Sequence, residues 1–245
     1  MKVHLIWRAC GIAGVAFILS LAGPARGQVA KAGSERFEKE IAAYEAADKT
    51  NPPPVGAIEF TGASGIRLWK TLAEDYPQYK VFNRGFGGSE MSDCVYFAER
   101  IVIPYKPKLI VIQAGGNDIN AGKSPEQVLA DFKAFVEKVR AKLPDVRIAY
   151  LSMNPSPSRW AQREKQQKGN ALVKAYIESG KNLDYIDFWG AMLGPDALPR
   201  EDLFVADRLH NNAAGYKIRA EIVRPHLEYL KSDPTAAAQA GAKGK

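Results

Sequence analysis

A chain of 245 residues that is 46% hydrophobic and 25% charged is typical of a soluble globular protein with a full core. Its formal net charge of +7 is only mildly basic, and no dense Lys/Arg block carries interleaved aromatic residues, so the sequence does not predict binding to nucleic acid.

Residues 1–27 are predicted to be a cleaved secretory signal peptide. Lys2 and Arg8 precede an apolar run at 9–23, and Ala25-Arg26-Gly27 supplies the small residues of a cleavage site. A run of about 15 residues is shorter than the roughly 20 that span a bilayer. We therefore expect a secreted or periplasmic protein without stable membrane insertion; an uncleaved anchor is the alternative. Cleavage would lower the net charge from +7 by three, and it would leave Cys94 without a disulfide partner.

The two ends of the remaining chain differ from its middle. Residues 28–54 are predicted to form a lead-in arm, with a short amphipathic helix that carries Phe37, Ile41 and Tyr44 on one side and a proline-rich connection after it. Residues 232–245 are poor in large apolar side chains and are predicted to be a disordered tail. The sequence thus predicts one domain at 55–231.

Within this domain, apolar runs of strand length alternate with amphipathic stretches of helix length. This alternation predicts an α/β fold in which helices cover both faces of a parallel sheet. The expected strands lie at 56–61, 79–83, 108–114, 146–152 and 183–188, and the expected helices at 65–75, 90–103, 125–143, 159–180 and 213–230. Ser124 and Gln127 predict a capping box at the start of the third helix, and Pro225 is expected to kink or shorten the last one.

The unusual polar segments follow the predicted strands. Ser64 follows the first strand, and the remaining segments are NRGFGGS at 83–89, GGND at 115–118 and DRLH at 207–210. Because ligands of an open α/β sheet bind at the carboxyl ends of its strands, these segments are expected to meet in one site.

Ser64, Asp207 and His210 are the candidates for nucleophilic catalysis. Ser64 lies on a strand-to-helix turn, where backbone N–H groups and the helix dipole favour developing negative charge, although a simple helix cap is the alternative. The spacing of Asp207 and His210 lets their side chains meet across one helical turn, with the imidazole facing Ser64; a surface turn is the alternative. The other histidine of the domain, His226, follows Pro225 and is expected to be a packing or surface residue.

Four further residues are candidates for binding roles. The Gly88 N–H and the Asn117 side-chain amide are candidate oxyanion donors; the alternatives are a tight glycine turn and an Asx turn. Arg159 and Trp160 follow the fourth strand and are candidates for lining the substrate site, although a helix-start arginine and a core tryptophan are equally compatible with the pattern.

These residues resemble the SGNH hydrolases, also called GDSL-type esterases and lipases. The matching blocks are Gly62-Ala63-Ser64, Gly88 within NRGFGGS, Gly115-Gly116-Asn117-Asp118 and Asp207-Arg208-Leu209-His210. The resemblance implies a flavodoxin-like three-layer α/β/α fold with a five-stranded parallel sheet. It also implies Ser64 as nucleophile, His210 as base, Asp207 as its orienting acid, and an oxyanion hole from the N–H groups of Ser64 and Gly88 with the Asn117 side chain. Ala63 replaces the family's Asp, as in a branch similar to platelet-activating-factor acetylhydrolases, and activity is expected to survive.

The resulting expectation is a serine esterase that removes acetyl or other short acyl groups from a small-molecule or glycan ester through an acyl-enzyme. One alternative is a lipase or lysophospholipase for longer chains, and another is an inactive glycan-binding module. A third is a nucleotide-binding protein, because residues 117–124 nearly match a phosphate-binding loop but lack its first glycine. No metal or other cofactor is predicted, and the oligomeric state remains open.

Overall fold

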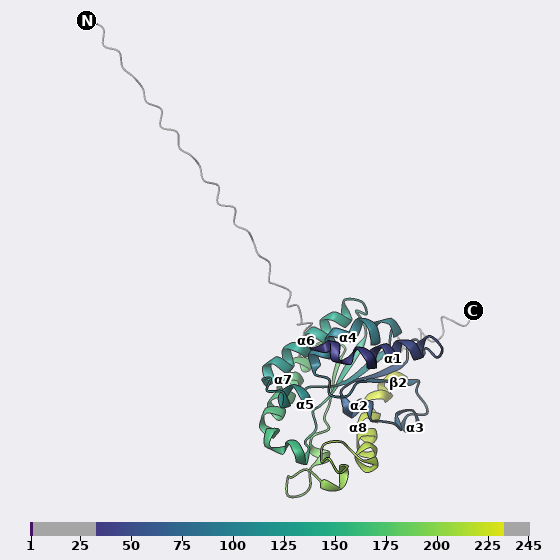
Figure 1. Ribbon diagram of the computed structural model, residues 1–245, viewed down its shortest axis with the longest axis vertical. Coiled ribbons are helices and arrows are strands. Elements are labelled where there is room, and N and C mark those ends of the chain that lie inside the picture. Colours follow the sequence, from purple (N-terminus) through teal and green to yellow (C-terminus); the bar gives the residue numbers. More distant parts are fainter. Residues whose placement is uncertain (2–32, 233–245) are drawn as a thin grey trace.

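The computed structural model describes Met1 and residues 33–232 (Figure 1). The predicted signal peptide at 1–27 and the predicted tail at 232–245 lie outside the described residues, except for Met1 and Ser232. Ser232 is the last residue of helix α8 (Ala213–Ser232). Among the described residues, none of the helices has both the length and the apolar character needed to cross a bilayer.

The centre of the fold is a five-stranded parallel sheet with the strand order β2-β1-β3-β4-β5. The strands are β1 (Ile58–Gly62), β2 (Val81–Gly85), β3 (Leu109–Gln113), β4 (Arg147–Leu151) and β5 (Leu183–Ile186). Every residue of β1 and β3 is buried, as expected for strands that are covered on both faces. This order is the flavodoxin-like one, which confirms the predicted fold class.

Helices cover both faces of the sheet, and side chains alternate between the two resulting cores. Ile110 and Ile112 of β3 pack with the helices of one layer, whereas Leu109 and Val111 pack with those of the other. The first layer contains α1 (Glu38–Asp48), α4 (Met91–Ile101), α6 (Pro125–Arg140) and α7 (Arg163–Glu178). The second contains α2 (Ser64–Arg67), α3 (Leu72–Asp75) and α8, on the other side of the sheet in Figure 1.

Several helices differ from the prediction. The helix expected at 65–75 consists of the two one-turn helices α2 and α3, and the short helix α5 (Gly116–Asn120) was not predicted. The helix expected at 159–180 begins as a 3₁₀ segment, η3 (Pro157–Gln162). The other 3₁₀ segments are η1 (Ser34–Phe37), η2 (Ile103–Tyr105), η4 (Gly190–Met192) and η5 (Glu201–Leu203).

Two further predictions concern helix ends. Pro225 was expected to kink or shorten the last helix. It does not shorten α8, because Val223 and Leu227 on either side of it are fully buried and their packing outweighs the lost hydrogen bond. The capping box is only half formed. The Ser124 hydroxyl accepts from the Gln127 N–H at 3.1 Å, but the Gln127 side chain turns away to donate to Asp131.

Candidate active site

A cavity of about 70 Å³ lies at the carboxyl ends of β1, β3 and β4. Four predicted site residues line it: Ser64, Asn117, Arg159 and His210. Asp207 lies behind His210. Gly88 and Trp160 are not among the lining residues; Trp160 stacks on Trp189 with a ring separation of 6.4 Å. Trp160 is therefore not part of the cavity wall, and its contact with a substrate stays a prediction.

Ser64 is the first residue of α2 and follows a tight turn. Gly62 ends β1 with φ 122°, and a Cβ there would lie 2.1 Å from the Gln113 carbonyl oxygen, so only glycine fits. In the described part of the chain, the Ser64 N–H donates to no acceptor, as is usual at the start of a helix. This N–H is therefore available to a ligand.

Ser64, His210 and Asp207 form one continuous chain of hydrogen bonds. The distance from Ser64 Oγ to His210 Nε2 is 2.8 Å, and that from His210 Nδ1 to Asp207 Oδ2 is 2.6 Å. The sequence predicted that Asp207 and His210 meet across a helical turn. Instead they share a loop in which Arg208 takes a left-handed conformation with φ 57°. This conformation places Asp207 Oδ1 as acceptor for the N–H groups of Leu209 and His210 at 2.8 and 2.9 Å.

These contacts set the charge of Asp207 and the tautomer of the His210 imidazole. Partial burial raises the pKa of the Asp207 carboxyl, but the hydrogen bonds from His210 and Leu209 outweigh this effect and lower the pKa to about 2. An ionised Asp207 selects the imidazole tautomer with hydrogen on Nδ1, so Nε2 of His210 is an acceptor for the Ser64 hydroxyl. The arrangement is therefore suited to remove the hydroxyl proton.

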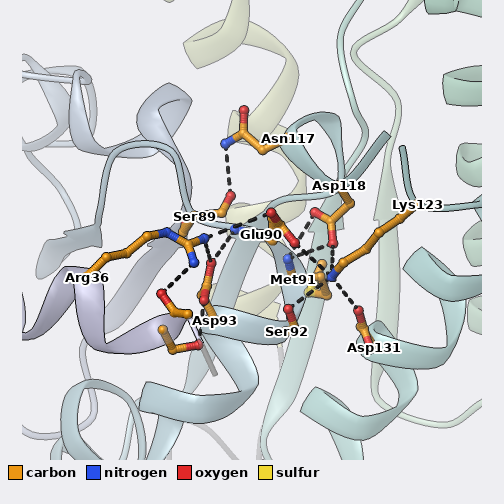
Figure 2. A network of polar contacts seen from close by, with 12 residues as sticks. Arg36, Ser89, Glu90, Met91, Ser92, Asp93, Asn117, Asp118, Lys123 and Asp131 are labelled. Carbon is orange, nitrogen blue, oxygen red and sulfur yellow. Dashed lines mark hydrogen bonds and ion pairs between the residues drawn. The ribbon is translucent and has the colours of Figure 1, made fainter. Parts of the chain in front are cut away.

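Asn117 lies at the start of α5 and holds the segment that carries Gly88. Its Nδ2 donates to the Ser89 carbonyl oxygen at 2.9 Å, and Figure 2 shows the amide nitrogen turned toward Ser89. One hydrogen of Nδ2 remains, and no acceptor for it is found within residues 33–232. Gly88 itself is exposed with φ 82°, and its N–H donates to no described residue.

The next residue, Asp118, holds the same segment two residues further along the chain. Its fully buried carboxylate accepts the Met91 N–H at 3.0 and 3.2 Å, at the start of α4, and lies 3.1 Å from Lys123 Nζ (Figure 2). Burial raises the pKa of Asp118, and the nearby Lys123 opposes this effect. Two consecutive residues of α5 thus hold the segment that directly follows Gly88.

Lys123 is the lysine of the near match to a phosphate-binding loop. Its ammonium group contacts three carboxylates: that of Asp118, that of Glu90 at 2.9 Å and that of Asp131 at 3.1 Å. A lysine that is already neutralised in this way is a poor ligand for phosphate. The contacts of Lys123 therefore argue against the nucleotide-binding alternative.

Arg219 of α8 is an important site residue that was not predicted. Its guanidinium, although fully buried, lines the cavity and donates to the Gly65 carbonyl oxygen at 3.0 Å, to Gln113 Oε1 at 2.6 Å and to Asn211 Oδ1 at 2.9 Å. Gly65 follows Ser64 and Asn211 follows His210, so one side chain fixes the neighbours of both. The only signals in the sequence are an arginine on the apolar face of a helix and a glutamine that ends an apolar strand.

Other candidate groups lie away from the cavity or are incomplete. His226 Nδ1 lies 2.8 Å from Asp184 Oδ2, at the amino-terminal half of β5 and thus away from the site edge, in agreement with its predicted packing role. Across the described residues, no group of three or more His, Cys, Asp or Glu side chains is arranged to hold a metal ion.

Comparison with known proteins places this site in a family. The GDSL-like Lipase/Acylhydrolase family matches residues 54–218. Platelet-activating factor acetylhydrolase IB subunit alpha1 of Pongo abelii is 27% identical over 172 residues, which cover 65% of this chain and 70% of the relative. Esterase TesA of Pseudomonas aeruginosa is 28% identical over 89 residues, or 36% of this chain and 44% of the esterase.

A solved structure shares the fold as well. The GDSL-like lipase of Bacteroides thetaiotaomicron superposes with a TM-score of 0.63 at 21% identity, covering 81% of this chain and 98% of the lipase. The family match spans most of the domain and contains all four polar segments. The chain belongs to the GDSL-like lipase/acylhydrolase family and is a carboxylic ester hydrolase.

Proposed function

We propose that this protein hydrolyses esters with Ser64 as nucleophile, His210 as general base and Asp207 as the acid that orients the imidazole. The observation that carries the proposal is the continuous hydrogen-bond chain of 2.8 and 2.6 Å that ends at the cavity. His210 Nε2 takes the hydroxyl proton while Ser64 Oγ attacks the ester carbonyl carbon. The imidazolium then protonates the leaving alcohol, and a water molecule activated by His210 releases the acyl group from Ser64.

Three donors are proposed to stabilise the oxyanion of each tetrahedral intermediate. These are the backbone N–H groups of Ser64 and Gly88 and the second hydrogen of Asn117 Nδ2. None of the three donates to a described acceptor, so each is free to meet the developing charge without first breaking a bond within the protein.

The size of the cavity supports a short acyl group. A cavity of about 150 Å³ in another protein holds a benzene molecule. The volume of about 70 Å³ here is roughly half of that, which suits an acetyl group or one with a few more carbon atoms. A longer acyl chain, as in the lipase alternative, would have to extend out of the cavity. The cavity volume does not bear on the alcohol half of the ester, for which we propose a glycan or a small molecule. Export through the segment at 1–27 also remains a proposal.

Active-site labelling tests the catalytic residues without a known substrate. A fluorophosphonate should form one adduct, which peptide mapping should locate on Ser64. Ser64→Ala should abolish the adduct and His210→Ala should slow it strongly, whereas the control variant His226→Ala should label like the wild type. No adduct between about pH 6 and 9, a range that extends well above the pKa of an ordinary histidine, would indicate the inactive binding module instead.

A series of esters with one alcohol tests the acyl preference. The value of kcat/KM should be highest for the acetate and should fall for the butyrate and the octanoate of p-nitrophenol, because the cavity has no room for the longer chains. A rate that rises with chain length would support the lipase alternative and contradict the short-acyl proposal.

A further inference from the structure

Arg159 occupies a position behind the proposed oxyanion donor Asn117. Both terminal nitrogens of its guanidinium donate to Asn117 Oδ1, each at 3.0 Å. Resting on the function proposed above, we infer that Arg159 is a positioning residue: it holds the Asn117 amide in the one orientation that points an N–H at the oxyanion.

The orientation of the amide is determined from both sides. A guanidinium has only donors, so it requires the oxygen of Asn117 on its side, and the Ser89 carbonyl oxygen has only lone pairs, so it requires the nitrogen. Rotating the amide by half a turn would place donors against donors at Arg159 and acceptors against each other at Ser89. With both contacts present, the second hydrogen of Nδ2 is held in a fixed direction at the edge of the cavity.

The positive charge of Arg159 also strengthens Asn117 as a hydrogen-bond donor. Burial disfavours the charged form of Arg159 and lowers its pKa, and no carboxylate in the described chain opposes this effect. The positive charge therefore acts mainly on Asn117. A cation at Oδ1 withdraws electron density from the amide and makes its N–H groups stronger donors. The guanidinium thus polarises the amide, and the N–H that points toward the oxyanion becomes more positive.

The segment that carries Arg159 is tied to the proposed catalytic loop. The Ser158 N–H donates to the Arg208 carbonyl oxygen at 3.0 Å, within the loop that contains Asp207 and His210. Arg159 itself departs from helical geometry, with φ −117° and ψ 17°, and this departure within η3 accompanies the turn of its side chain toward α5. The guanidinium is consequently fixed relative to both the base and the oxyanion donor.

The inference is tested first by comparing two neighbouring arginines. Arg159→Ala should lower kcat for a short-acyl ester by about tenfold or more, below the roughly hundredfold loss expected when the donor itself is removed in Asn117→Ala, and should leave KM nearly unchanged. The control variant Arg163→Ala removes a guanidinium that contacts Trp160 and Glu164 but not Asn117, and it should retain the wild-type kcat. A rise in KM with unchanged kcat for Arg159→Ala would overturn the inference in favour of direct substrate binding.

A double-mutant cycle then asks whether Arg159 acts through Asn117. In the Asn117→Ala background, Arg159→Ala should change kcat by less than about twofold, because the amide that it orients is absent. A loss as large as in the wild-type background would overturn the inference.

Chemical rescue separates loss of the cation from loss of folding. Millimolar guanidinium ion should raise kcat of Arg159→Ala several-fold but should leave the Asn117→Ala and Arg163→Ala variants unchanged. Arg159→Lys, which keeps the charge but loses the two-pronged contact, should retain more activity than Arg159→Ala and should melt like the wild type. Failure of both rescue by guanidinium and retention in Arg159→Lys would overturn the inference. Fluorophosphonate labelling of Ser64 in the wild-type enzyme would still show whether the proposed function holds.

Discussion

The surroundings of Asp207 keep its carboxyl group ionised. Asp207→Asn preserves the shape of the side chain but replaces an ionised acceptor with a neutral amide, so the imidazole tautomer is no longer selected. We expect kcat to fall by about a thousandfold, with an unchanged melting temperature because the Asp207 side chain is 48% exposed. Asp196→Asn is a matched control, since Asp196 also accepts an N–H two residues ahead in a surface turn. A variant Asp207→Asn with normal kcat would remove Asp207 from the proposed catalytic residues.

The pKa of Asp207 also predicts the shape of the pH profile. Because this pKa is lowered to about 2, Asp207 stays ionised at every pH above about 4 and cannot cause a loss of activity there. Any fall of kcat/KM on acidification above about pH 4 should therefore follow a single proton that Asp207 does not take up, and a logarithmic plot of kcat/KM against pH should reach a limiting slope of one. A slope approaching two would show that a second group titrates in this range.

At the scale of elements, the contact between α5 and α4 should matter for both stability and activity. Asp118→Ala would leave the Met91 N–H without its buried acceptor and Lys123 with one carboxylate fewer. We expect the free energy of unfolding to fall by about 2–3 kcal/mol, measured by urea denaturation, because a buried group loses a charged partner. We also expect kcat to fall, since the loop that carries Gly88 loses one of its two anchors.

An exposed ion pair offers the control for this variant. Glu126 and Lys168 join α6 and α7 at 2.6 Å with both side chains more than half exposed, so Glu126→Ala should change the free energy of unfolding by less than about 0.5 kcal/mol. Equal effects of Asp118→Ala and Glu126→Ala would contradict the anchoring role of Asp118.

The same elements show what the sequence can and cannot predict. The five strands were located within a few residues, because continuous apolar runs report burial on both faces of a sheet. The helix α5 was missed, since five residues are too few for helical periodicity. The position of Ser64 followed from local turn chemistry, which the sequence contains. The roles of Arg219 and of the Arg159 contact could not be predicted from spacing along the chain, because they depend on segments that meet only after folding.

At the scale of the whole molecule, the amino-terminal arm is part of the folded domain. Phe37 and Ile41 are buried in the same core as α4 and α6, and the Tyr44 hydroxyl donates to the Gly85 carbonyl oxygen at 2.5 Å. Asp48 pairs with the buried Arg84 at 2.5 Å. The arm therefore covers the strand end and the loop that lead to Gly88, and it should unfold together with the rest of the domain.

The variant Ile41→Ala tests whether the arm unfolds together with the rest of the domain. Ile41 is completely buried, so its truncation should leave a cavity and lower the free energy of unfolding by about 2–4 kcal/mol. If the arm belongs to the cooperative unit, the single transition seen by fluorescence and by circular dichroism should move as a whole to lower urea concentration. Lys39→Ala, on the exposed side of the same helix, should shift it by less than about 0.5 kcal/mol. An early separate transition in Ile41→Ala, with the main transition unmoved, would show that the arm is a lead-in that the domain does not need for its stability.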